Sequence, residues 1–150
     1  MTSQAVLCVA SAQFSTQVFR SLRAGQDIVD LGAGRDGSPN GATALFASRV
    51  DRSTAVDVFP RPEGLPRNVD WYHGRIEDWF QEQVCFPAER PDAFILRNVL
   101  HFLERRWVLD ALLPWLAETL APGGIIAIST FHRHPDPALP SPWPALYRLA

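Results

Sequence analysis

The chain has 150 residues, 47% of them hydrophobic and 20% charged, which suits one globular domain with a hydrophobic core. Its formal net charge of −2 argues against a nucleic-acid-binding protein. The chain has no lysine, so no lysine side chain can act as a Schiff-base or general-base residue. No apolar run is long enough to span a membrane. A secretory signal has basic residues near its start, whereas the first basic residue here is Arg20, and the two cysteines make no disulfide framework. We therefore expect a cytoplasmic protein.

The first predicted element is a helix across residues 1–25. Apolar residues recur every four positions from Val6 through Phe14 to Leu22, which places them on one helical face that ends near Gly25. A buried strand over residues 28–31 follows directly.

Three glycines then follow in the spacing G-x-G-x-x-G, at Gly32, Gly34 and Gly37. Glycine lacks a side chain, so the turn can be tight and a ligand can lie against bare backbone; a side chain at Gly32 is expected to fill the space that the ligand needs. The spacing alone fits a dinucleotide or a nucleoside. Asp30 would repel a pyrophosphate and can accept hydrogen bonds from an ammonium group, so it favours a cationic ligand.

A short helix over residues 42–48 precedes the second predicted strand, 55–58. Asp57, near the end of that strand, is placed to accept hydrogen bonds from ribose hydroxyls, a feature common to NAD and S-adenosylmethionine sites. Three prolines within residues 60–66 exclude a regular crossover helix, so we expect a loop there.

The rest of the chain continues the alternation of strands and helices. We predict strands at 69–74, 92–96 and 125–128, a helix at 76–84, and an amphipathic helix at 103–116 that Pro114 kinks. The prediction is therefore an α/β domain whose cofactor-binding core is 26–131, followed by a proline-rich tail, 132–150.

The glycine turn with Asp30, the Asp57 strand end and the turn Leu120-Ala121-Pro122-Gly123-Gly124, in this order, resemble the class I S-adenosylmethionine-dependent methyltransferases. The last turn is similar to the "L-x-P-G-G" turn before strand five of that family. The resemblance implies a Rossmann-like fold with a parallel sheet in the order 3-2-1-4-5, lacking the family's last strands, and S-adenosylmethionine as the cofactor. It covers most of the chain.

The resemblance also implies a set of cofactor-binding residues around the carboxyl ends of the strands. Arg75 stands where the family often has an acid for the adenine amine, which leaves Ile76 to pack on the ring and Glu77 to reach the amine. The implied cofactor-binding residues are Asp30, Gly32, Gly34, Asp57, Val58, Ile76, Glu77, Arg97 and Asn98.

His101, shortly after strand four, is the candidate catalytic base, with a structural hydrogen bond as the alternative role. The amino-methylating Asn/Asp-Pro-Pro-Tyr motif is absent there, which favours a small-molecule acceptor over a nucleic acid. His132 and His134 have no evident third metal ligand, so no metal is expected. Trp143 and Tyr147 either cover a flat substrate or pack on the sheet.

The predicted activity is methyl transfer to a small molecule. The alternatives are a catalytically silent, cofactor-binding or regulatory subunit and, less well supported, an NAD-dependent oxidoreductase. Strand 125–128 is apolar on both faces and is predicted to lie at the sheet edge, so we expect either a homodimer through that edge or coverage by residues Leu139 to Ala150.

Overall fold

The computed structural model describes residues 5–8, 11–34, 41–85 and 90–129. Its strands are β1 (Ala5–Cys8), β2 (Asp27–Leu31), β3 (Arg52–Asp57), β4 (Val69–His73), β5 (Ala93–Arg97) and β6 (Ile125–Ser129). Its helices are α1 (Ser11–Ser21), α2 (Ala42–Ala47), α3 (Ile76–Cys85), α4 (Arg105–Trp107) and α5 (Leu113–Thr119), with a 3₁₀ turn η1 (Leu100–Phe102) and a π-helical turn η2 (Val108–Leu112).

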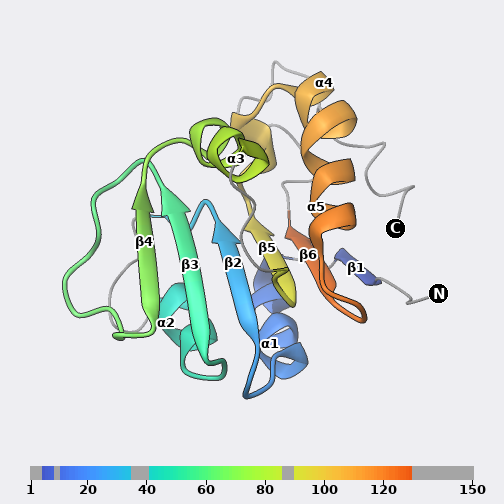
Figure 1. The fold of residues 1–150 in the computed structure, drawn as a ribbon. Helices are drawn as coiled ribbons and strands as arrows, with labels where there is room; N and C mark the ends of the chain where they lie inside the picture. The colour runs from blue at the N-terminus through green and yellow to red at the C-terminus, as the bar shows by residue number, and fades with distance from the viewer. Residues whose placement is uncertain (1–4, 9–10, 35–40, 86–89, 130–150) are drawn as a thin grey trace.

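All these strands form one parallel sheet in the order β1-β6-β5-β2-β3-β4 (Figure 1). The strands predicted from the sequence occupy it as β4-β3-β2-β5-β6, so the predicted order 3-2-1-4-5 is confirmed. The chain reverses its direction of travel across the sheet between β2 and β5, where Asp30 pairs with Ile95. Ligands of open parallel sheets bind beyond the carboxyl ends of the strands at such a reversal.

The prediction of one helix across residues 1–25 is wrong at its start. Ala5–Cys8 forms strand β1, which runs parallel to β6, and only Ser11–Ser21 is helical. A four-residue apolar run cannot be assigned to helix or strand by periodicity alone. The neighbouring β6 is buried on both faces, and such strands lie inside a sheet, so the unpaired edge of β6 favours a strand here.

Because β1 pairs with it, β6 is not the sheet edge, contrary to the sequence-based expectation. The reason for expecting a homodimer through β6 therefore no longer applies. Residues Leu139 to Ala150, the other predicted cover for this edge, lie outside the described residues.

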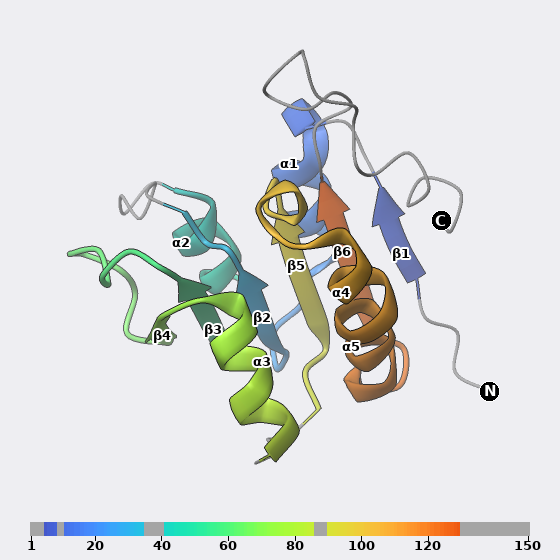
Figure 2. The same cartoon turned by 90° about the horizontal axis from the view of Figure 1, so that it is seen from above.

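Helices cover both faces of the sheet (Figure 2). On one face, Phe14, Val18 and Leu22 at the α1 side pack with Phe46 of α2 against the strands. On the other, Trp79 of α3 joins a larger cluster from η2 and α5. None of the helices that the structure describes combines the length and apolar content of a membrane span.

The connection between β3 and β4 contains no helix, as its prolines predicted. Leu65 from this loop is buried with Ala44 of α2 and Val69 of β4. The Arg61 guanidinium donates hydrogen bonds to the carbonyl oxygens of Val69, at 2.5 Å, and Pro66, at 3.2 Å. One carbonyl of the edge strand β4 is thereby occupied, which limits pairing with another chain.

The segment from α4 to α5 is a helix interrupted by the wide turn η2 just before Pro114. Proline has no N–H to donate to the preceding turn, and a π-helical turn is one way to accommodate that loss. The predicted kink is confirmed at this position.

Candidate functional site

The glycine turn after β2 folds against β3. The backbone N–H groups of Gly32 and Ala33 donate to the Val56 carbonyl oxygen at 2.8 and 3.2 Å. Gly32 and Gly34 have φ angles of +77° and +85°, a region that residues with side chains rarely adopt. Gly37, the third glycine of the motif, lies outside the described residues.

The two described glycines differ in what surrounds them. A Cβ atom on Gly32 would lie 2.5 Å from Cγ2 of Val99, whereas a Cβ on Gly34 would meet no atom within 4 Å. The absence of a side chain at Gly32 therefore lets Val99, in the segment after β5, pack closely against the turn, whereas Gly34 borders open space. The expectation that a side chain at Gly32 would fill ligand space is corrected: the space next to Gly32 is already occupied by protein.

Asp57 at the end of β3 faces this turn. One of its carboxylate oxygens accepts from the Gly34 N–H at 2.8 Å and the other from the Phe59 N–H at 3.0 Å. Each carboxylate oxygen has capacity for further hydrogen bonds. The carboxylate is thus held at a set position beside open space and can still accept hydrogen bonds from a ligand.

The end of β5 contributes Arg97 and Asn98. Asn98 has φ +52°, and its side-chain oxygen accepts from the Ser129 hydroxyl at 3.2 Å, while its N–H donates to the Ser129 carbonyl oxygen at 2.8 Å. A guanidinium nitrogen of Arg97 lies 3.4 Å from the Ala33 carbonyl oxygen. β6 thereby orients Asn98, and Arg97 reaches the glycine turn.

The start of α3 supplies a third side. Arg75 and Glu77 form an ion pair at 2.5 Å, so the arginine that replaces the expected acid is engaged with the next acid along the chain. Ile76 between them is buried.

These segments enclose one cleft of about 530 Å³ at the carboxyl ends of the strands. The structure brings together all of the predicted cofactor-binding residues except Asp30. The lining residues are Gly32, Gly34, Asp57, Val58, Phe59, Gly74, Arg75, Ile76, Glu77, Arg97, Asn98, Val99, Phe102 and Leu103.

Asp30 lies beneath the turn, only 2% exposed, and is not among the residues lining the cleft. Its carboxylate accepts from the Thr43 hydroxyl at 3.1 Å. Burial raises its pKa to about 6, with Arg97 and the Thr43 hydrogen bond acting in the opposite direction and Asp57 raising it slightly further. Asp30 is therefore placed to support the turn from below. The sequence had indicated direct contact with the ligand instead.

His101, the predicted base, lies on η1 beside the cleft but does not line it. Its ring packs on that of Phe102, with centroids 4.0 Å apart and planes at 42°. Phe102 lines the cleft instead, and sequence reasoning passed over it. The signal available was its position one residue after His101, in a segment already assigned to the site.

A second hollow of about 600 Å³ lies between the sheet and helices α3 and α5. Asp27, Arg52 and Asp70, near the amino ends of β2, β3 and β4, line its mouth, and Trp79 and Trp115 line its wall. It is larger, but it lies away from the glycine turn and from the carboxyl ends of the strands. The smaller cleft has the position at which parallel sheets bind ligands.

Within the described ranges, no group of three His, Cys, Asp or Glu side chains is placed to hold a metal ion. His132, His134, Trp143 and Tyr147, which the sequence offered as candidates, lie outside those ranges.

No protein-family profile matches the chain. A curated relative, the trans-aconitate 2-methyltransferase of Azoarcus sp. (strain BH72), is 30% identical over an alignment of 138 residues that covers 82% of this chain and 47% of the relative. The chain thus spans about half the length of this relative.

Solved structures match the fold at lower identity. A candidate rRNA methylase from Clostridium thermocellum has a TM-score of 0.60 and 18% identity, covering 87% of this chain and 74% of that one. The chain has the class I methyltransferase fold. A candidate methyltransferase from Streptococcus mutans in complex with SAH agrees, with a TM-score of 0.51, 19% identity and coverage of 81% and 73%. The predicted resemblance to the class I S-adenosylmethionine-dependent methyltransferases is confirmed.

Proposed function

We propose that this chain binds S-adenosylmethionine in the 530 Å³ cleft and transfers its methyl group to a small molecule. The observation that carries the proposal is the Asp57 carboxylate, fixed by the Gly34 and Phe59 N–H groups beside the open side of the glycine turn. A fixed carboxylate at this place accepts hydrogen bonds from ribose hydroxyls without having to reorganise.

The charges of the site favour this ligand over a dinucleotide. Asp57 faces the turn and Asp30 lies below it, whereas Glu77 is paired with Arg75. Arg97 is the cation that reaches the turn, so two acids face one cation there. A pyrophosphate placed here would approach carboxylates, whereas a nucleoside bearing an ammonium and a sulfonium would be attracted to them. An NAD-dependent oxidoreductase is therefore the weaker hypothesis.

Each side of the cleft has a distinct role in the proposal. Asp57 accepts hydrogen bonds from the ribose hydroxyls, and Ile76 packs on the adenine ring. Glu77 lies at the adenine end of the cleft, where it is paired with Arg75. The methionine end extends past Gly34 toward Asn98 and Arg97, where a guanidinium can pair with its carboxylate.

When bound, S-adenosylmethionine supplies a methyl group on a positively charged sulfur, and the electron pair of the broken carbon–sulfur bond stays on that sulfur. The protein's task is to hold the acceptor in line with this bond, and such positioning is itself a large part of catalysis. An acceptor whose attacking atom carries a proton passes it to solvent or to a nearby base. His101 stays a proposal for that base: it lies on η1 and its ring contacts that of Phe102, which lines the cleft.

Two observations support a small acceptor. The curated relative is named for methylation of trans-aconitate, a small carboxylic acid. The chain also carries a net charge of −2, while a nucleic acid substrate requires clustered positive charge. The name of the Clostridium structure points to RNA, but its 18% identity supports the fold alone.

Calorimetric titration with S-adenosylmethionine, S-adenosylhomocysteine and NADH tests the cofactor. We expect both adenosyl compounds to bind and NADH not to bind. Transfer of a labelled methyl group from S-adenosylmethionine to trans-aconitate and to a transfer RNA then separates the acceptor classes. Binding of NADH alone would overturn the cofactor assignment, and labelling of the RNA alone would overturn the small acceptor.

A further inference from the structure

Large apolar side chains exposed to solvent are unevenly placed among the described residues. The two most exposed are Phe102, at 78%, and Val58, at 55%, and both line the cleft. Leu45 and Val84, less exposed, lie on α2 and α3 away from it. An exposed apolar surface in a ligand cleft is a contact surface for a ligand.

The backbone of Phe102 is fixed in a turn, and its ring contacts the His101 ring. It belongs to the 3₁₀ turn η1, where its N–H donates to the Val99 carbonyl oxygen at 3.0 Å and the neighbouring Leu100 is fully buried. The His101 ring packs on it at a centroid distance of 4.0 Å. The ring still remains mostly exposed, so it presents a flat surface to the cleft.

The position of Phe102 along the cleft indicates which ligand it meets. Asp57 and Ile76 line the cleft from β3 and α3, at the end proposed for the nucleoside. Phe102 enters from the β5 side, beyond Arg97 and Asn98, on the other side of the strand reversal. Resting on the proposed function, this is the end at which a methyl acceptor meets the cofactor.

We propose that Phe102 is the specificity-determining wall of the acceptor subsite and selects acceptors with a flat, unsaturated or aromatic face. Stacking and edge-to-face contacts reward a planar partner over a puckered one of equal size. Arg97 lines the same side of the cleft, but the proposed function already pairs it with the methionine carboxylate, so the Phe102 ring is the part of this wall that is left to select the acceptor. His101 acts on this wall indirectly, by positioning the ring.

The test compares two small acids with the same carbon skeleton, one with an aromatic ring and one with a saturated ring. Benzoate is planar, cyclohexanecarboxylate is puckered, and both carry one carboxylate. Their affinities are measured by ligand-observed NMR on the full chain saturated with S-adenosylhomocysteine. The proteins are the wild type, Phe102→Ala, Phe102→Tyr, which keeps the ring, and Val84→Ala, a control that removes an exposed apolar side chain outside the cleft.

We expect benzoate to bind the wild type about two- to tenfold more tightly than cyclohexanecarboxylate. Phe102→Ala abolishes this preference, while Phe102→Tyr and Val84→Ala retain it. Absence of benzoate binding to the wild type, or an unchanged preference in Phe102→Ala, overturns the proposal.

A separate calorimetric titration with S-adenosylhomocysteine distinguishes this proposal from the proposed function. Binding to the wild type and to Phe102→Ala with similar affinity places Phe102 outside the cofactor subsite, as expected. A loss of more than tenfold in Phe102→Ala assigns the ring to the cofactor and overturns the acceptor wall. No binding to the wild type contradicts the proposed function itself.

Discussion

Val99 occupies the space next to the α-carbon of Gly32: its Cγ2 atom lies 2.5 Å from the position that a Cβ atom on that glycine would take. The side chain of Val99 is itself buried, at 8% exposure, so it has little room to move. This contact packs the segment that follows β5 against the glycine turn after β2.

This contact predicts different outcomes for alanine at the two glycines. Gly32→Ala is expected to lower the free energy of unfolding by about 1–3 kcal/mol through overpacking against Val99, in addition to the cost of its positive φ. Gly34→Ala has the cost of the positive φ alone, about 1–2 kcal/mol, because its Cβ meets open space. Urea unfolding of both variants measures the difference, and equal losses would contradict it.

Gly34→Ala is expected to weaken binding of S-adenosylhomocysteine by about tenfold or more, since the added methyl group enters ligand space. Calorimetry on the folded variant measures this effect. An unchanged affinity would mean that the ligand does not pass over Gly34.

Asp57→Ala is expected to weaken S-adenosylmethionine binding by about 1.5–3 kcal/mol, the range for hydrogen bonds to a charged group. The variant also frees the N–H groups of Gly34 and Phe59, so its stability is measured in parallel. Asp110→Asn, which alters an exposed carboxylate on η2, is the control and keeps wild-type affinity. Full affinity in a folded Asp57→Ala protein would show that the ribose is held elsewhere.

Asp30 predicts a pH dependence of stability. Its pKa is raised from 3.8 to about 6 on folding, so between these values the folded state retains a proton that the unfolded state has lost. The unfolding free energy contributed by this group therefore falls as the pH rises from about 4 to about 6, by up to about 3 kcal/mol. Burial is the main cause of this rise in pKa; of the groups that face Asp30, Arg97 and Thr43 lower the pKa and Asp57 raises it.

The measurement is urea unfolding of the wild type and Asp30→Asn from pH 4 to pH 8. The variant cannot ionise at this position, so its stability relative to the wild type is expected to rise between pH 4 and pH 6 and then level off. The opposite slope would show that the Arg97 guanidinium stabilises the ionised carboxylate more than burial disfavours it.

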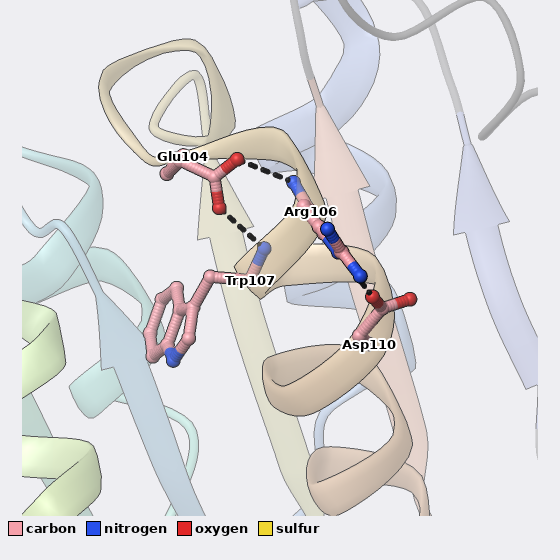
Figure 3. A network of polar contacts seen from close by, with 4 residues as sticks. All are labelled: Glu104, Arg106, Trp107 and Asp110. Carbon is pink, nitrogen blue, oxygen red and sulfur yellow. Dashed lines mark hydrogen bonds and ion pairs between the residues drawn. The ribbon is translucent and has the colours of Figure 1, made fainter.

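Glu104 caps the helical segment that follows η1. Its carboxylate accepts from the N–H groups of Arg106, at 3.1 Å, and Trp107, at 2.7 Å (Figure 3). Glu104→Ala is expected to destabilise the protein by about 1 kcal/mol, as the loss of a helix cap does. Glu104→Gln retains one acceptor oxygen and is expected to lose less, as measured by thermal unfolding.

The ion pair between Arg106 and Asp110 lies in the same segment (Figure 3). A variant of this pair distinguishes the contribution of the helix cap from that of a surface charge. Both side chains are exposed, and exposed ion pairs four residues apart contribute about 0.3–0.5 kcal/mol. Asp110→Asn is therefore expected to cost less than Glu104→Ala. The reverse order would show that the helix start does not depend on this cap.

Contiguous residues determined much of the fold and the outline of the site. Apolar runs mark β2, β3, β5 and β6, and the glycines and Asp57 follow strand ends directly, so their grouping at one edge follows from a parallel sheet. The conformation of such segments depends mostly on near neighbours in the chain. The strand order came from the resemblance to the methyltransferase family, and right-handed crossovers are consistent with it.

Only the tertiary structure decided the features that depend on residues far apart in the chain. The apolar run at Ala5–Cys8 became a strand beside β6, Gly32 serves the packing of Val99, Asp30 is buried under Thr43, and Phe102 rather than His101 lines the cleft. In each case the outcome depends on which distant group occupies the neighbouring space. Packing in three dimensions sets that occupancy, and local periodicity does not contain it.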